Sequence, residues 1–371
     1  MNRLKEVAIV FLKLGFLGFG GPAVHIAMME EEVVRKRKWM THEHFLDLIG
    51  ATNLIPGPNS TEMALHCGKE RAGWKGLLLA GACFILPAVF ITGIFAWLYQ
   101  QYGASPKVQP YIYGIKPAII GVIASLMVTL GKKAIKSVEL AILGIAALSL
   151  AITGVNEVII LFGLGGAGMA IYAIKSRPDK VVSFIPLFLI VPLSANNKSA
   201  NWKIFWIFLK VGSILYGSGY VLFSFLNAEL VKPGLLAQQV LTDAIAVGQF
   251  TPGPVFSSAT FIGWQLNGLN GAALATLGIF LPSFLFVGLL NPLVYRLRKS
   301  KILSAFLDAV NVTAIALILV VCFDLSQSAI GSWQTILIAV TGFAVSFYFK
   351  KLNTAFVIIG GAVLGYFLIL I

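Results

Sequence analysis

Residues 11–15 read Phe-Leu-Lys-Leu-Gly, and residues 208–212 read Phe-Leu-Lys-Val-Gly. The likeness extends from 11–90 to 208–285, with an offset that falls only from 197 to 195 and so needs two single-residue gaps. An apolar chain that repeats itself in this way is typical of membrane transporters with two-fold pseudosymmetry. Further matched positions are Phe19-Gly20 with Tyr216-Gly217, Glu32 with Glu229, Asp47 with Asp243, Pro56-Gly57-Pro58 with Pro252-Gly253-Pro254, and Leu86-Pro87 with Leu281-Pro282.

The composition argues against a water-soluble protein. Of the 371 residues, 58% are hydrophobic and 12% are charged, and the mean hydropathy is +0.88. Apolar runs long enough to cross a bilayer as helices recur, for example 77–98, 111–131 and 354–371. Backbone groups at membrane depth must be hydrogen-bonded internally, and these runs are too long for barrel strands. We therefore expect an all-α polytopic membrane protein without a removable signal peptide.

Basic residues alternate between the two halves. Lys132, Lys133 and Lys136 correspond to an uncharged stretch, 327–331, in the second half. The nearly neutral stretch 100–110 corresponds instead to one that contains Arg296, Arg298, Lys299 and Lys301. Because cytoplasmic loops collect Lys and Arg, the two halves should have opposite orientations.

An extra crossing within 181–196, which has no partner in the first copy, would invert the second copy. The expected domains are a first membrane repeat over 1–177, a linker with the extra crossing over 178–203, and a second, inverted repeat over 204–371. The N-terminus is then expected in the cytoplasm and the C-terminus outside the plasma (inner) membrane. Orientation and an anionic cargo account for the net charge of +13, so no nucleic acid is expected as a partner.

Two apolar segments, 7–29 and 44–66, are interrupted at their middle by Gly20-Gly21-Pro22 and Pro56-Gly57-Pro58. Proline removes a backbone donor and glycine loosens the chain, so a helix must break there. If Arg35–Lys38 lies on the same side as Arg3, each segment has to enter and leave by one face, as a re-entrant hairpin. Two ordinary spans would place Arg35–Lys38 outside, and this alternative stays open. The expected fold is two inverted-topology repeats with re-entrant or broken helices.

The helix breaks are candidate binding sites for an anion. Breaks at membrane depth are tolerated where they are buried in protein or line a wet cavity, and a half-helix that begins near Pro58 would direct free amides toward that cavity. A proline kink that serves packing alone is the alternative, but the second copy repeats the break at the matched position. The candidate substrate-binding residues at the breaks are Gly20, Gly21, His25, Asn53, Pro56, Gly57, Pro58, Asn59, Thr61, Gly217, Gln249, Pro252, Gly253, Pro254 and Ser257.

Lys13 and Lys210 are further candidates for contact with the anion. Each lies shortly before a glycine break in an apolar stretch, and an intramembrane cation usually faces a partner, an ion or water. A lysine that snorkels from near a helix end is the alternative. Several carboxylates could bind a coupling proton if they are buried, or could cap helices and form salt bridges instead. These are Glu32, Asp47, Glu62, Glu229 and Asp243.

Two short motifs do not carry the chemistry that they suggest. Residues 163–168 match a dinucleotide fingerprint but lie inside an apolar span with no strand before it, so we expect them to pack helices closely. The stretch 42–44, His-Glu-His, is too compressed for a helical zinc motif. The cysteines are scattered in apolar runs. We therefore expect no metal and no cofactor, and we find no duplicated catalytic set that would indicate an enzyme.

Both copies carry motifs that together resemble one known family. The first copy has Phe19-Gly20-Gly21-Pro22 with His25, then Trp39-Met40, Phe45, Pro56-Gly57-Pro58, Arg71-Ala72-Gly73, Gly76 and Leu86-Pro87. The second has Tyr216-Gly217-Ser218-Gly219-Tyr220, Pro252-Gly253-Pro254, Gly263, Gly268, Gly271 and Leu281-Pro282-Ser283. This combination is similar to that of the chromate transporter family over essentially the full length. The second copy has Ser218-Gly219 where the first has Gly21-Pro22, so the half-sites need not contribute equally.

The resemblance implies a secondary transporter that exports chromate, a tetrahedral oxyanion, and thereby confers chromate resistance. The chain has no Walker-type loop, so ATP hydrolysis is not expected to drive it. A sulfate or other oxyanion transporter and a passive anion channel stay open as alternatives. The expected partners are the oxyanion and the lipid bilayer, with a second copy of the chain, as a homodimer, undecided.

Overall fold

The computed structural model describes residues 2–176, 200–216, 219–297, 300–349 and 352–369, and every regular element in these ranges is a helix. The crossing expected within 181–196 and the candidate Gly217 lie outside these ranges. Several helical stretches are long and apolar enough to cross a membrane, so the expected all-α polytopic membrane protein is confirmed. These stretches are Asn59–Tyr102, Gln109–Ala134, Glu157–Ser176, Val255–Leu289 and Lys301–Ala329.

The first broken segment is a hairpin. Helix α1 (Arg3–Leu17) leads in, and α2 (Pro22–Met29) returns and continues into the π-helical turn η1 (Glu30–Lys36). The chain reverses at Gly20 and Gly21, whose φ angles of 109° and 81° are left-handed values that favour glycine. Proline then occupies the first position of α2, where the N–H that it lacks would have had no helical partner.

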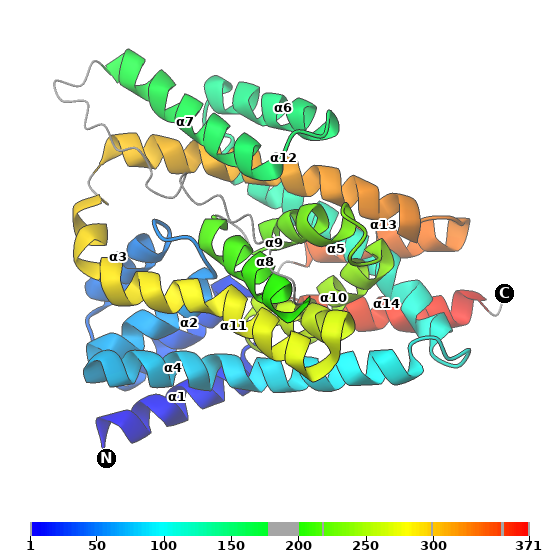
Figure 1. Ribbon diagram of the computed structural model, residues 1–371, viewed down its shortest axis with the longest axis horizontal. Coiled ribbons are helices and arrows are strands. Elements are labelled where there is room, and N and C mark those ends of the chain that lie inside the picture. The colour runs from blue at the N-terminus through cyan, green and yellow to red at the C-terminus, as the bar shows by residue number, and fades with distance from the viewer. Residues whose placement is uncertain (1, 177–199, 217–218, 298–299, 350–351, 370–371) are drawn as a thin grey trace.

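The second broken segment turns back in the same way. Helix α3 (His42–Thr52) leads in, the chain breaks over 53–58, and α4 (Asn59–Tyr102) begins. The long helix α4 is itself bent at Ala72 and Gly73, and Gly68 meets Gly76 across the bend, which lets its arms lie close together. The first arm, 59–71, completes the hairpin, and the long arm, 74–102, runs the length of the molecule (Figure 1).

Both hairpins open at the same end of the molecule. Glu6, near the start of α1, accepts hydrogen bonds from Trp39 at 3.1 Å and Arg71 at 2.6 Å, and Arg37 lies 3.9 Å away. Burial alone would raise the pKa of Glu6, but these three partners lower it, so the carboxylate stays ionised. Segments 7–29 and 44–66 therefore fold back on themselves in the structure, as expected for re-entrant hairpins.

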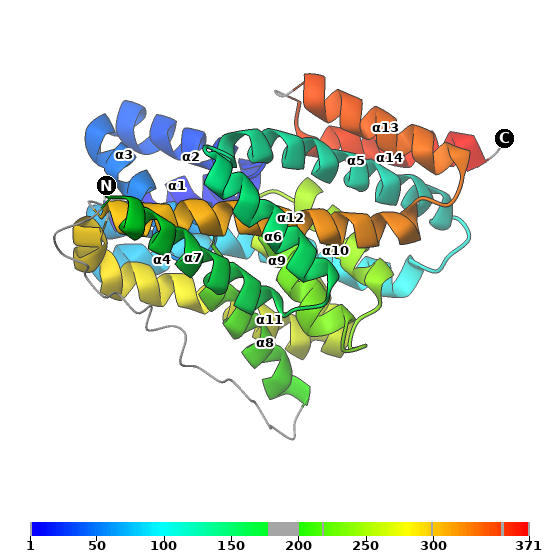
Figure 2. The same ribbon diagram turned by 90° about the horizontal axis from the view of Figure 1, so that it is seen from above.

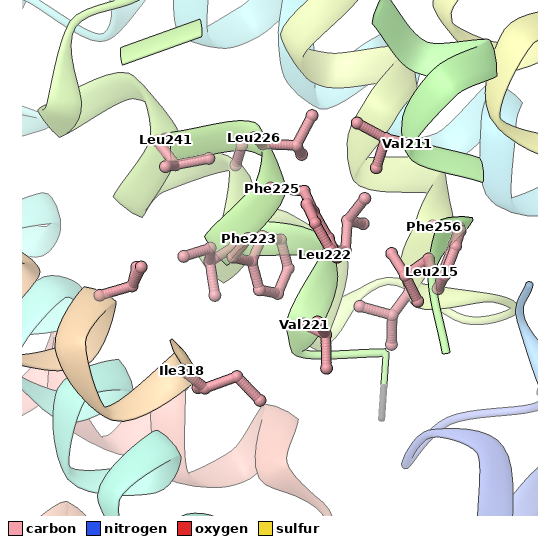
Figure 3. Close-up of a cluster of buried hydrophobic side chains, with 14 of the residues drawn as sticks. Val211, Leu215, Val221, Leu222, Phe223, Phe225, Leu226, Leu241, Phe256 and Ile318 are labelled. Carbon is pink, nitrogen blue, oxygen red and sulfur yellow. The ribbon is translucent and has the colours of Figure 1, made fainter. Parts of the chain in front are cut away.

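The second half repeats these elements. Helix α8 (Ala200–Ile214) is followed by a break, then α9 (Val221–Leu226) and the π-helical η3 (Asn227–Val231). Helix α10 (Gln238–Phe250) is followed by the second break, the 3₁₀ turn η4 (Val255–Ser257) and α11 (Ser258–Leu297). Helix α11 bends at Asn267 and Gly268, as α4 does at Ala72 and Gly73. Apolar side chains surround the break between α8 and α9, among them Leu215, Leu222 and Phe256 (Figure 3).

The long arms of α4 and α11 run antiparallel. Trp74 packs on Gly288, whereas Gly81, further along α4, packs on Phe284, earlier in α11. Figure 1 shows the same opposition: α4 ends on the side of the molecule opposite to the one where α11 ends. These arms are matching elements, so their opposite directions are those expected if the two halves are inverted.

Among the remaining helices, each half packs a long helix against two helices of the other half. Helix α5 (Gln109–Ala134) packs on α13 (Trp333–Tyr348) and α14 (Thr354–Ile369) of the second half. Helix α12 (Lys301–Ala329) packs on α6 (Val138–Ile152) and α7 (Glu157–Ser176) of the first half (Figure 2). Gly165 and Gly168 pack on α12, where they meet Val310 and Ala309, so part of the glycine-rich stretch 163–168 lets helices approach closely.

Candidate functional site

The breaks of the two halves meet in two matching pairs. The amide of Gly57 donates a hydrogen bond to the carbonyl of Leu215 at 2.8 Å, and the amide of Gly253 donates to the carbonyl of Gly18 at 2.7 Å. Each second break is thus bonded to the first break of the other half. Backbone groups that the interrupted helices leave unpaired are satisfied in this way inside the protein, as membrane depth requires.

A cavity of about 740 Å³ lies beside these breaks. Six of the candidate residues from the first half line it: Gly20, Gly21, Asn53, Gly57, Pro58 and Asn59. The second half contributes Tyr216, Gly219, Tyr220, Val255 and Phe256, and α5, the loop after it and α12 contribute Lys133, Lys136, Asp308 and Asn311, among others. The cavity is therefore assembled from both halves, and its walls are breaks on one side and the α5 and α12 ends on the other.

Two half-helices begin at the cavity wall. Gly21 caps α2 and Pro58 caps α4, and neither makes a side-chain capping hydrogen bond. The first amides of such helices lack intrahelical acceptors and lie at the positive end of the helix dipole. Asn59, at the start of α4, donates its side-chain amide to Asn53 at 2.9 Å, which holds both polar groups at the wall. This arrangement suits a negatively charged ligand.

The cations of the cavity come from the end of α5. Lys136 forms an ion pair with Asp308 at 2.7 Å, whereas Lys133 has no carboxylate partner in the described parts of the chain. In the sequence, these lysines indicated only which side of the membrane the loop after α5 faces. The sequence shows that these lysines are clustered. Their position at the cavity could not be predicted, because it depends on how α5 packs against the second half.

Lys13 and Lys210 do not line the cavity. Lys13 is ion-paired with Glu32 at 2.8 Å, and Lys210 with Glu229 at 2.6 Å. Each pair joins the two arms of a first hairpin, α1 with η1 and α8 with η3. The partner that an intramembrane cation needs is thus a carboxylate of the same hairpin, in both halves.

His25 is buried and makes a hydrogen bond from its Nε2 to the Gly18 carbonyl at 2.8 Å. That carbonyl also accepts the amide of Gly253, so His25 belongs to the contact between the breaks and not to the cavity wall. The second half has Leu222 at the matching position, and the Leu215 carbonyl lacks this donor.

The other candidates lie behind the wall. Gln249 accepts a hydrogen bond from the Tyr220 hydroxyl at 3.0 Å, and Ser257 accepts one from Thr92 at 3.2 Å. Thr61 is fully buried. Pro56, Pro252, Gly253 and Pro254 shape the breaks without lining the cavity.

The candidate carboxylates differ in their surroundings. Asp243 accepts a hydrogen bond from Tyr99 at 2.7 Å and lies 3.5 Å from Lys116. Asp47 is half-buried on α3. Glu62 is fully buried on the first arm of α4. The Ser283 hydroxyl is a neighbouring donor, but within the described ranges neither carboxylate oxygen has a partner in full hydrogen-bond geometry.

Comparisons with known proteins agree with this architecture. The family model for the chromate transporter matches residues 5–169 and again residues 202–366. A chromate transport protein of Cupriavidus metallidurans is 30% identical over 98% of this chain and 92% of its own length. A probable chromate transport protein of Synechococcus elongatus is 30% identical over 98% of this chain and 95% of its own.

Shorter relatives match about one half. An uncharacterized transporter of Bacillus subtilis is 27% identical over 38% of this chain and 82% of its own length. No solved structure matches significantly. Because the family model matches both halves and relatives that are 30% identical match over nearly the full length, this chain belongs to the chromate transporter family.

Proposed function

We propose that this protein is a secondary transporter that exports chromate across the cell membrane and so confers chromate resistance. The observation that carries the proposal is the cavity, which is lined by the starts of α2 and α4, without side-chain caps, and by Lys133, which has no carboxylate partner among the described residues. Free amides and one ammonium group can replace the hydration shell of a tetrahedral dianion. The names of the relatives favour transport over catalysis.

The proposed orientation places the basic end of the molecule in the cytoplasm of the cell. The cavity is lined by the end of α5 and the start of α12, at the end where α1 also begins (Figure 2). Basic residues concentrate in cytoplasmic loops, so this cavity is open toward the cytoplasm. An inside-negative potential favours outward movement of each negative charge by about 2.3 kcal/mol per 100 mV, and of a dianion by about twice that.

Proteoliposomes that contain only the purified protein test this function. We expect chromate to accumulate in vesicles when the potential is positive inside, and to reach a concentration above that of the bath. Empty vesicles provide the control. Because a passive anion channel would also accumulate chromate at this potential, vesicles preloaded with unlabelled chromate are tested at zero potential. Transient uptake of labelled chromate above the bath level then identifies a carrier, and simple equilibration identifies a passive channel.

Sulfate is the second candidate substrate. It is a tetrahedral dianion like chromate, so amide and ammonium groups that bind one can also bind the other. Competition of chromate uptake by sulfate, molybdate and phosphate separates these candidates. A chromate exporter should be inhibited most strongly by unlabelled chromate.

A further inference from the structure

Glu62 stands directly behind the cavity wall. A side-chain carbon added at Gly57 would lie 2.5 Å from its Oε1 and 2.5 Å from the Ser283 hydroxyl. Gly57, Pro58 and Ser60 line the cavity, whereas Glu62 itself is fully buried. Only the backbone of the break therefore separates this carboxyl group from the space proposed for the anion.

The groups that face Glu62 are few and carry no positive charge. Helix α11 presents Ser283, and the first break of the second half presents Tyr216, which also lines the cavity and interacts electrostatically with Glu62. On its own helix, His66 lies one turn further on and is buried. No lysine, arginine or second carboxylate in the described ranges acts on Glu62.

This isolation distinguishes Glu62 from the other candidate carboxylates. Glu32, Glu229 and Asp243 each have a lysine within ion-pair distance. An acidic residue also occupies this position in the first half only. At the matching place in the second half, Ser257 and Ser258 align with Thr61 and Glu62. Ala88, from α4 of the first half, lies beside Gly253 where Ser283 lies beside Gly57. Both serines and Ala88 are fully buried, so the matching place behind Gly253 holds no acid.

An ionised Glu62 would oppose a dianion in the cavity. Charges separated by protein interact more strongly than charges separated by water, and a buried carboxylate without a partner is itself costly. The neutral acid removes both penalties. Anion binding and protonation of Glu62 therefore favour each other, and by linkage the coupling is reciprocal.

We propose that Glu62 takes up one proton when the oxyanion binds, and that proton and anion cross the membrane together. The inference rests on the proposed function and adds the coupling ion to it. The proton comes from water in the cavity, converts the Glu62 carboxylate to the acid, and leaves on the far side when the anion leaves. A dianion that travels with one proton still carries net negative charge, so the membrane potential still favours export.

Calorimetry of chromate binding to the purified protein, above pH 7.5 and in two buffers of different ionisation enthalpy, measures the protons taken up. We expect wild type to bind close to one proton per anion, with an affinity that weakens by up to tenfold per pH unit. Glu62→Gln should bind chromate with no proton uptake and no such pH dependence. Ser258→Ala, the uncharged counterpart in the second half, should behave as wild type.

Proton uptake by Glu62→Gln equal to that of wild type would overturn the assignment, as would chromate binding by wild type without any proton. If wild type binds no oxyanion at any pH, the proposed function itself fails. A pH-sensitive dye inside wild-type proteoliposomes gives an independent readout should the variant not fold. An imposed chromate gradient must then move protons in the direction of the anion, and a dye signal that stays flat during chromate flux rejects the coupling.

Discussion

The amide of Gly253 lies 2.7 Å from the carbonyl of Gly18, and its counterpart Gly57 makes the same bond to Leu215. These bonds fasten the second break of each half to the first break of the other. The proposed site therefore lies where the two halves meet, and its wall contains residues from both. A transporter that alternates between two faces needs such a shared centre, because movement of one unit against the other then changes access without dismantling the binding groups.

Replacement of Gly57 by alanine should impair both folding and transport. Its φ of 141° is a conformation that residues with a side chain rarely adopt, and the added methyl group would meet Glu62 and Ser283. We expect a loss of about 1–3 kcal/mol in stability together with loss of chromate uptake. Thermal unfolding in detergent measures the first effect. Gly163→Ala is the matched control, because Gly163 is helical with open space around it, and this variant should retain wild-type stability and uptake.

Neutralisation of Lys133 should weaken chromate binding. Lys133 lines the cavity without a carboxylate partner in the described ranges, so Lys133→Gln removes an unpaired positive charge from the proposed site. We expect a loss of about tenfold in affinity, which corresponds to about 1.4 kcal/mol. The neighbouring Lys132 lies over the ring of Phe347 and does not line the cavity, so Lys132→Gln should stay within about twofold of wild type. Equal affinities for both variants would exclude Lys133 from the site.

The pair of Lys210 and Glu229 separates two roles for the intramembrane lysines. If the pair holds the hairpin together, Lys210→Met leaves Glu229 without its cation and should cost about 1–3 kcal/mol, less than for a fully buried pair. Removal of both charges, in Lys210→Met with Glu229→Gln, should then recover stability and uptake. If Lys210 instead coordinates the anion, as its sequence position suggested, the double variant will fold but fail to take up chromate.

Single-cysteine labelling tests the orientation of the hairpins. In a background without Cys67, Cys83 and Cys322, a cysteine at the exposed position Lys38 should react with a membrane-impermeant reagent only from the cytoplasmic side. A cysteine at Lys107, in the loop between α4 and α5, should react only from outside. Reaction of Lys38→Cys from the outside would reverse the proposed orientation or require a crossing before it.

Several features of the fold could be predicted because they depend on local chemistry. Glycine and proline at 20–22 and 56–58 break helices in any surroundings, and they do so here. The alternation of basic loops predicted opposed halves, and the long arms of α4 and α11 run antiparallel. The same reasoning placed Gly20, Gly57 and Asn59 at breaks, and these residues line the cavity.

The partners of the charged side chains could not be predicted. Lys13 and Glu32 both stood out in the sequence, yet nothing local indicates that they pair with each other. Lys133 reaches the cavity because α5 packs on α13 and α14, and Glu62 is left without a cation because Ser283 arrives from α11. Such contacts join positions far apart in the chain, and their free energy depends on the burial and geometry that only the assembled helices provide.

The duplicated sequence thus determined where helices stop and which loops carry positive charge, and it predicted two oppositely oriented units, because backbone breaks and charge placement act through neighbours in the chain. Tertiary structure decided which breaks meet, which lysine lines the cavity and which carboxyl group lies behind its wall. The physical reason is that a buried polar group has no water to satisfy it, so its partners are those that the packing of distant segments brings within reach.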